Sequence, residues 1–142
     1  MRLASFTDYG LRVLMRLAGA PDESISTGQI AEEFAISQNH LAKVVQDLGR
    51  GGFVRAQRGR SGGLRLARPA HAITVGEVVR HLEQRFAIVE CFRADGGACV
   101  LQPRCRLKPK LAAARAAFMT ELDRTTVADC AWPGDGSLVA AA

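Results

Sequence analysis

The chain has 142 residues, 48% of them hydrophobic, and a formal net charge of +5. This length suits one domain with an appended helix, and the apolar content excludes a disordered tail. No run of about 18 apolar residues is present, which excludes a membrane span. The N-terminus contains Asp8 and Arg12 and has no continuous apolar core, so it does not resemble a secretory signal. We therefore expect a cytoplasmic protein with no membrane partner.

The positive charge is unevenly distributed along the chain. From Arg50 to Arg68 there are six arginines and no acidic residue. A basic segment of this kind favours contact with nucleic acid. The alternative is a basic surface that is only solvated.

The first predicted helix covers residues 7–20, because Leu14 and Leu17 belong to a set of apolar residues that recur on one helical face. Ser5, followed three residues later by Asp8, resembles a capping box. The Gly-Ala-Pro sequence that comes next predicts the end of this helix.

Residues 26–52 predict two short helices joined by a tight turn at residues 35–36. The first starts near Ser26 or Thr27, and Ser37 caps the second. Apolar residues in the second helix recur at i, i+3, i+4 and i+7, and a run of glycines ends it. This pattern is typical of a helix-turn-helix, whose second helix enters the DNA major groove. The outward residues of that helix are candidate DNA contacts: Ser37, Gln38, Asn39, His40 and Lys43.

Two alternating segments, residues 53–57 and 64–67, flank a glycine-rich turn. They predict a β-hairpin that carries arginines on its exposed face and at its tip. A hairpin directly after a helix-turn-helix is called a wing, and a basic tip can enter the minor groove. The alternative is an ordinary two-stranded edge with solvated arginines. The tip supplies further candidate DNA contacts: Arg58, Arg60, Ser61, Gly62 and Gly63.

The second half of the chain predicts two more helices. Thr74 and Glu77 form a capping box before a helix over residues 75–84. A long, alanine-rich helix with Pro109 in its first turn follows over residues 109–130. Because this helix has too little of its own domain to cover it, we expect a two-fold homodimer with the helix in the interface. The alternative is a helix that folds back on its own domain.

These elements define a mainly α fold with a small β-hairpin: a winged helix-turn-helix plus a long C-terminal dimerisation helix. We expect four regions. They are a DNA-binding domain (1–84), a cysteine loop (85–108), the dimerisation helix (109–130) and a flexible tail (131–142).

Three of the four cysteines, Cys91, Cys99 and Cys105, lie in one loop. The paired CxxC spacing of most zinc sites is absent, and thiolates on a long loop are the usual ligands of an iron–sulfur cluster. Surrounding arginines favour the thiolate form. Thiol-based sensing, zinc binding and a purely structural role remain open. Cys130 lies beyond the long helix and is a poor fourth ligand within the same chain.

No Ser/His/Asp set, paired carboxylates or phosphate-binding loop in the sequence supports an enzyme. These patterns carry most hydrolytic and phosphoryl-transfer chemistry. We therefore expect a protein that is not an enzyme.

Six segments, in order, carry a family resemblance: SFTDYGLRVLMRLA, SQNHLAKVVQDLGRGGFV, RGRSGGLRLARPA, TVGEVVRHLE, CRLK and ELDRTTVAD. Together they resemble the nitric-oxide-sensing repressor family called NsrR, part of a wider group of winged-helix iron–sulfur regulators that includes IscR. The resemblance implies a cytoplasmic homodimer that binds double-stranded operator DNA. It also implies that nitric oxide acts as the signal, reacting with the cluster iron and so releasing the operator.

The resemblance further implies a set of cluster ligands. Cys91, Cys99 and Cys105 match the three cysteine ligands, and Asp8 matches an aspartate supplied by the partner subunit. A [4Fe–4S] cluster is thereby favoured over a [2Fe–2S] cluster. IscR-like members have a histidine where Lys108 stands, and the gap between Cys91 and Cys99 is longer than usual. The first alternative is an IscR-type regulator of redox or iron–sulfur status. The second, which the sequence favours less, is a thiol or metal redox protein.

Overall fold

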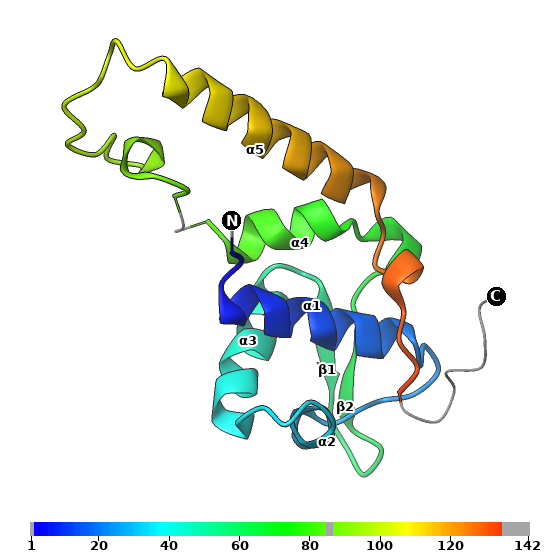
Figure 1. The fold of residues 1–142 in the computed structure, drawn as a ribbon. Coiled ribbons are helices and arrows are strands. Elements are labelled where there is room, and N and C mark those ends of the chain that lie inside the picture. Colours follow the sequence, from blue (N-terminus) through cyan, green and yellow to red (C-terminus); the bar gives the residue numbers. More distant parts are fainter. Residues whose placement is uncertain (1, 85–86, 135–142) are drawn as a thin grey trace.

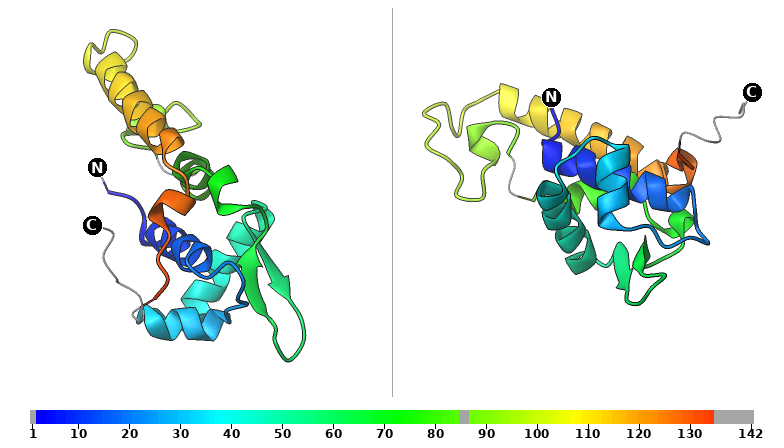
Figure 2. Two further views of the ribbon diagram at one scale, coloured as in Figure 1. Left: turned by 90° about the vertical axis from the view of Figure 1, so that its right-hand side faces the viewer. Right: turned by 90° about the horizontal axis from the view of Figure 1, so that it is seen from below.

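The computed structural model describes residues 2–84 and 87–134 of the chain. In these residues it confirms the expected fold class, with five α-helices and one antiparallel hairpin (Figure 1). Helices α1 to α4 surround one core, and α5 lies outside it against α4 (Figure 2). In chain order the elements are α1 (Ser5–Ala18), α2 (Thr27–Glu33), α3 (Gln38–Arg50), β1 (Val54–Gln57), β2 (Gly63–Leu66), α4 (Val75–Leu82) and α5 (Leu107–Arg124).

The core is built from the apolar faces of the first four helices and the hairpin. Leu14 on α1, Ile30 on α2 and Leu41 on α3 are all completely buried. Each such side chain contributes about 1.5–3 kcal/mol relative to an exposed one. The hydrophobic periodicity of the sequence therefore marks the right faces of these helices.

Helix α1 begins earlier than the sequence predicts, at Ser5, and ends at Ala18. The predicted capping box is wrong, because the N-cap is Ala4 and no side chain bonds there. Instead the Ala4 N–H donates to Glu83 Oε1 at 2.8 Å, across the fold. A carboxylate after α4 therefore satisfies a helix end that sequence patterns assign to a local cap.

The helix-turn-helix forms where the sequence predicts it. The Ser26 hydroxyl accepts a hydrogen bond from the Gln29 N–H at 3.1 Å and so caps α2. Ala35 in the turn has φ of 52°, a left-handed conformation that lets the chain reverse within a few residues. Ser37 occupies the N-cap position of α3, but its side chain makes no capping bond, so that part of the prediction is wrong.

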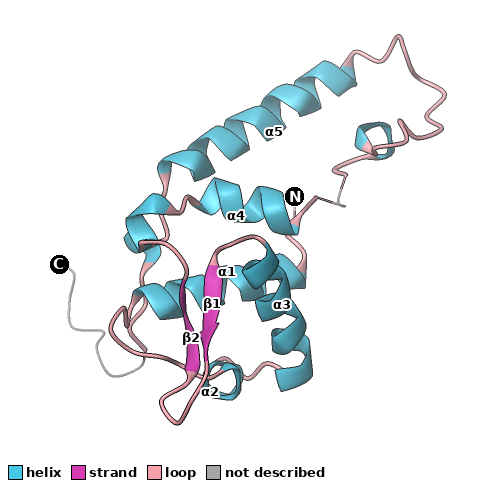
Figure 3. Cartoon of the chain, turned by 180° about the vertical axis from the view of Figure 1, so that it is seen from behind, coloured by secondary structure: helices cyan, strands magenta, loops and turns pink. Residues whose placement is uncertain are grey.

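The hairpin pairs Val54 with Leu66 and Arg55 with Arg65 in antiparallel register (Figure 3). Its strands start and end within one residue of the predicted segments. Ile25, just before α2, bridges to β2: its N–H donates to the Leu64 carbonyl at 3.2 Å, and its carbonyl accepts from Leu64 at 2.7 Å. The hairpin is thus fixed to the helix-turn-helix at its inner edge.

The N-terminus of α4 confirms Thr74 as its cap, since the Thr74 hydroxyl accepts from the Glu77 N–H at 3.1 Å. The Glu77 carboxylate does not complete the predicted capping box. It accepts from Arg68 at 2.7 Å instead. The side chain that would close a local box therefore joins α4 to the end of the hairpin.

Helix α5 starts at Leu107 and ends at Arg124, so it does not continue to Cys130 as predicted. None of its 18 residues is buried. It rests on α4, where Arg80 donates to Asp123 at 2.6 Å. Thr125 to Gly134 then return across the domain, so the described part of the predicted flexible tail, residues 131–134, packs against α1. Residues 135–142 lie outside the described residues, and the division into four regions stays a prediction.

The two serines at helix N-caps allow a matched test of this local structure. We expect Ser26→Ala to lower the free energy of unfolding by about 1 kcal/mol, because it removes the hydrogen bond to Gln29. Ser37→Ala should change it by no more than about 0.5 kcal/mol, because no capping bond is lost. Urea unfolding followed by circular dichroism measures both, and equal losses would contradict the assignment.

Candidate functional site

The candidate DNA-reading residues lie together at the N-terminal end of α3. Ser37, Gln38, Asn39, His40 and Lys43 are all exposed. The opposite face of the same helix is buried through Leu41, Val44 and Leu48. Burial of that apolar face therefore turns the polar one outward.

Two contacts that involve histidine rings hold α3 in place at its ends. The His40 ring meets the Tyr9 ring of α1 edge-on, with centroids 5.4 Å apart. At the other end, His81 of α4 lies with Nε2 3.0 Å from the Asp47 carbonyl oxygen. Sequence patterns did not identify Tyr9 or His81, because these contacts join residues far apart in the chain.

The wing tip projects beyond the domain (Figure 3). Arg58, Arg60 and Ser61 are exposed, and neither arginine forms an ion pair with any described residue. Gly59 has φ of 115°, and its carbonyl accepts from the Gly62 N–H at 2.9 Å, which closes the turn. The tip is thus a compact loop with uncompensated positive charge.

Gly62 and Gly63 belong to the hairpin turn more than to its exposed tip, and both are half-buried. Gly63 is the first residue of β2 and packs on the backbone of Ile25, where a side chain would lie 2.8 Å from the Ile25 carbonyl carbon. In this structure the contact of Gly63 is therefore with the Ile25 backbone. Gly62 lies under the tip, so any contact with DNA would be through its backbone.

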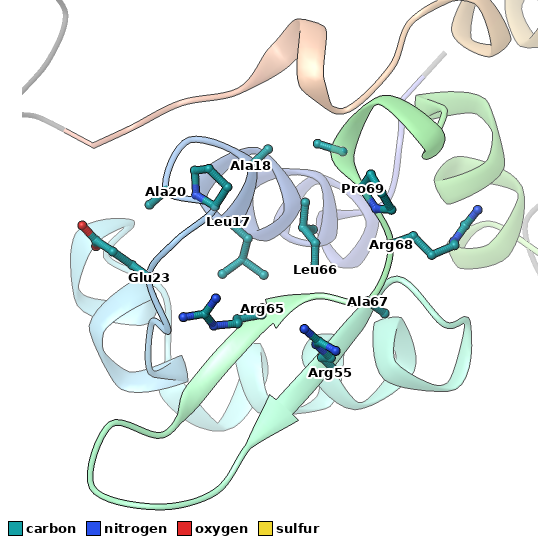
Figure 4. Close-up of a pocket in the computed structure, with 12 residues that line it drawn as sticks. Leu17, Ala18, Ala20, Glu23, Arg55, Arg65, Leu66, Ala67, Arg68 and Pro69 are labelled. Atoms are coloured by element: carbon teal, nitrogen blue, oxygen red, sulfur yellow. The ribbon is translucent and has the colours of Figure 1, made fainter.

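A cavity of 310 Å³ lies at the base of the hairpin, beside the C-terminal end of α1 (Figure 4). Arg55 and Arg65, which face each other across the strands, line it together with Leu17 and Leu66. Arg65 donates to the Asp22 carbonyl at 2.7 Å and so fixes the loop between α1 and α2. The basic face of the wing therefore extends from its tip to its base.

The three clustered cysteines lie on the loop between α4 and α5. Each is a free thiol and partly exposed. The loop is held by short-range bonds, such as Ala98 N–H to Glu90 Oε1 at 3.0 Å and Gln102 to the Gly96 carbonyl at 2.9 Å. Within residues 2–84 and 87–134, no group of three or more His, Cys, Asp and Glu side chains is arranged to hold a metal ion.

Asp8 lies on the first turn of α1, and the described part of the chain does not group it with these thiols as a metal site. Its carboxylate accepts two hydrogen bonds from Arg12, at 2.8 and 3.2 Å. Both side chains are nearly half exposed, at 47% and 44%. A surface ion pair of this spacing contributes only about 0.3–0.5 kcal/mol, so Asp8 is available for another partner.

A family model described as Rrf2, an iron-dependent transcriptional regulator, matches residues 3–132. The chain belongs to the Rrf2 family of transcriptional regulators. Its curated relatives include the regulator NsrR of Bacillus licheniformis, 44% identical over 130 residues that make up 91% of each chain. NsrR of Geobacillus kaustophilus is 47% identical over 131 residues, 91% of this chain and 88% of the relative. The resemblance that the sequence carries is therefore confirmed.

Solved structures agree with this assignment. CymR, the global cysteine regulator of B. subtilis, superimposes with a TM-score of 0.76 at 30% identity, over 92% of this chain and 96% of that one. IscR of T. potens gives 0.72 at 25% identity, over 91% and 85%. Because these Rrf2 relatives are regulators, the expectation that the chain is not an enzyme is confirmed. No helix in the described residues is both long and apolar enough to cross a membrane.

The donor chemistry of the cysteine loop fits an iron–sulfur cluster. Three free thiols on one loop are the ligand type such clusters take, and two cationic side chains, Arg104 and Arg106, adjoin Cys105. Within one chain the thiols do not yet form a closed site. The loop therefore supplies the right type of ligand for a cluster. A fourth ligand would have to come from another residue.

Proposed function

We propose that this Rrf2 protein is a dimeric repressor whose operator binding is controlled by nitric oxide through an iron–sulfur cluster on the cysteine loop. The observation that carries the proposal is the presence, in one chain, of a helix and wing with exposed, unpaired cationic side chains and a loop with three free thiols. The relatives named NsrR support the family resemblance from which the nitric oxide signal is inferred.

The DNA contacts follow from the outward face of α3. Asn39 at the start of the helix presents an amide, which can bond both N6 and N7 of adenine in the major groove. Lys43, one turn further on, suits a phosphate. Arg58 and Arg60 at the wing tip suit the negative potential of a narrow minor groove. Together these groups read one half-site of a palindromic operator.

Helix α5 supports the proposed homodimer. It has no buried residue, although Phe118 and Met119 are large and apolar. With Ile88 they line a cavity of 290 Å³ between α5, α4 and the N-terminal segment. An apolar helix face of this kind is stabilised when a second copy covers it, and a two-fold pair would bring two α3 helices to successive major grooves.

Cys91, Cys99 and Cys105 would hold the cluster as thiolates, [4Fe–4S] in preference to [2Fe–2S]. Its iron would supply the coordination position at which nitric oxide binds. Asp8 of the partner subunit would complete the ligand set. The carboxylate is a weaker match to such iron than a thiolate, which makes it the replaceable ligand.

The chain itself offers Asp8 a second partner. When Asp8 is not held by the cysteine loop of the other subunit, it pairs with Arg12, as in this structure. Helix α1 packs on α3, so a loop that holds Asp8 restrains the helix supporting the DNA-reading helix. Exchange of Asp8 between these partners would therefore change the restraint on α3.

For DNA binding, we expect Asn39→Ala to weaken operator binding by about 1–3 kcal/mol while leaving non-specific DNA binding unchanged, because a base contact is lost. Arg60→Gln should weaken both and lower the slope of log K against log salt by about 0.9, because one phosphate or groove contact is lost. Fluorescence anisotropy over a salt series measures both.

Lys110→Gln is the control for net charge, since Lys110 is exposed at the start of α5, far from the wing. Its salt slope should match that of the wild type. A slope that falls equally in Arg60→Gln and Lys110→Gln would remove the wing tip from the interface.

For the cluster, anaerobic purification followed by visible absorption and native mass spectrometry should show iron and sulfide on the wild-type chain. Replacing Cys91, Cys99 or Cys105 with alanine should abolish both, because each thiolate is a ligand. Cys130→Ala is the matched control and should keep them. A colourless protein, or one that carries only zinc, contradicts the proposal.

The signal is tested on the same anaerobic protein by titration with nitric oxide and, separately, with oxygen. Loss of operator binding at a few equivalents of nitric oxide, before any effect of oxygen, is the expected result. The reverse order would indicate an IscR-type regulator of redox or iron–sulfur status.

The role of Asp8 has a separate test. We expect Asp8→Asn to lose iron faster to a chelator than the wild type, as followed by absorption and native mass. Arg12→Gln should lose it more slowly, because the competing partner of Asp8 is gone. If both variants retain iron like the wild type, Asp8 is not a ligand.

A further inference from the structure

Trp132 is the only tryptophan of the chain, and it lies on the segment that returns from α5 to the helix-turn-helix. We propose that Trp132 is a positioning residue for operator binding: residues 125–134 form a strap that ties the end of α5 to the turn between α2 and α3. This inference rests on the proposed DNA-binding function. The strap is visible as the orange segment beside α1 in Figure 1.

The strap begins with firm attachment to α4. The Val75 N–H donates to the Thr125 carbonyl at 2.8 Å, and the Val127 N–H donates to the Ile73 carbonyl at 2.9 Å. The Val127 side chain is 1% exposed and belongs to the domain core. The end of α5 therefore cannot move relative to the start of α4 without breaking these bonds.

The next turn of the strap is internally fixed. Thr126 donates to Asp129 Oδ2 from its N–H and from its hydroxyl, both at 2.7 Å. These hydrogen bonds hold the pKa of Asp129 below its usual value, so the carboxylate stays ionised, and the turn stays bonded, to a lower pH than for a free aspartate. A short 3₁₀ helix, Ala128–Cys130, follows. This part can therefore transmit a displacement instead of absorbing it.

The strap then crosses the end of α1 in direct backbone contact. The Trp132 N–H donates to the Met15 carbonyl at 2.9 Å. Gly19 lies directly beneath, so close to the Trp132 backbone that any side chain at this position would overlap it. The absence of a side chain at Gly19 is therefore what allows the strap to lie against α1.

The Trp132 ring ends on the helix-turn-helix itself. It packs on the Phe34 ring with centroids 5.2 Å apart and an interplanar angle of 35°. Phe34 is the C-cap of α2 and directly precedes Ala35, whose left-handed φ makes the turn into α3. The contact therefore bears on the residues that set the angle between the two helices.

A partly buried ion pair beside the strap strengthens the same junction. Arg16 on α1 is 6% exposed and donates to Glu33, the last residue of α2, at 2.7 Å. Gly134, at the end of the strap, lies beside the Arg16 guanidinium. A Cβ placed on Gly134 would be 3.6 Å from the guanidinium carbon. The end of α2 is thus held from two sides, by Arg16 and by the Trp132 ring.

This arrangement gives α5 a route to the DNA-reading unit. Hydrogen bonds from side chains within residues 90–108 connect the described residues of the cysteine loop with one another and, through Lys108, with the start of α5. A change in the loop or in the α5 dimer interface therefore passes along α5. The strap connects the far end of that helix to the turn before α3.

The first experiment compares Trp132→Ala and Trp132→Phe in the full chain, with a duplex selected by the wild-type protein from random DNA and a scrambled duplex of equal length. Trp132→Ala should weaken binding to the selected duplex about tenfold, the order of one aromatic contact, and leave the scrambled duplex unchanged. Trp132→Phe should recover most of the loss, because a ring still meets Phe34.

A purely stabilising role gives a different result. Partial unfolding of Trp132→Ala would weaken binding to both duplexes by the same factor, and that outcome overturns the proposal, as does unchanged binding to the selected duplex. If the wild-type protein selects no sequence at all, the proposed function itself fails, so the two failures can be told apart.

The second experiment needs no change at Trp132 and covers the case in which Trp132→Ala does not fold. Asp123→Asn removes the partner of Arg80 at the end of α5, whereas Glu121→Gln neutralises an exposed carboxylate two residues earlier. The fluorescence of Trp132 should shift, and selected-duplex binding should weaken, in Asp123→Asn and not in Glu121→Gln. Equal behaviour of the two variants overturns the strap as a connection between α5 and the helix-turn-helix.

Discussion

Every surface that this protein can present to DNA depends on the burial of one face of α3. Leu41, Val44 and Leu48 are completely buried against the rest of the domain. Because a helix turns about 100° per residue, burying these positions leaves the first turn of α3 exposed on the other side. The wing follows directly from the same constraint, since β1 starts a few residues after α3 and its Val54 enters the same core.

The second half of the molecule, from the cysteine loop to the end of α5, is not organised around a buried face. Helix α5 buries nothing of its own, and the loop before it is bonded mainly within itself. Such elements are stable in position only if something else holds them. Here α4 packs against part of the helix, and the strap through Val127 holds its end. The loop with the thiols is bonded mainly within itself and to the start of α5, whereas the helix attached to it is fixed to the domain.

This contrast suits a sensor joined to a DNA-binding unit. A rigid winged helix-turn-helix keeps the reading geometry, and the exposed loop and helix offer groups for a cofactor and for a second copy of the chain. Membership of the Rrf2 family places the protein among transcriptional regulators. The proposed cluster, nitric oxide signal and dimer would explain why three free thiols, an exposed Asp8 and a helix with no buried residue occur in one small chain.

The helix-turn-helix, the hairpin and the Thr74 cap could be predicted from the sequence, because they depend on local periodicity and on hydrogen bonds within a few residues. The sequence also placed the three thiols on one loop by their spacing. Three features could not be predicted in this way: Glu83 bonds the start of α1, α5 ends at Arg124, and Trp132 reaches Phe34. The first and third join residues far apart in the chain, and the segment after Arg124 bonds to residues near the start of α4. The choice of a distant partner over a local one is made by packing, which no pattern in a single sequence records.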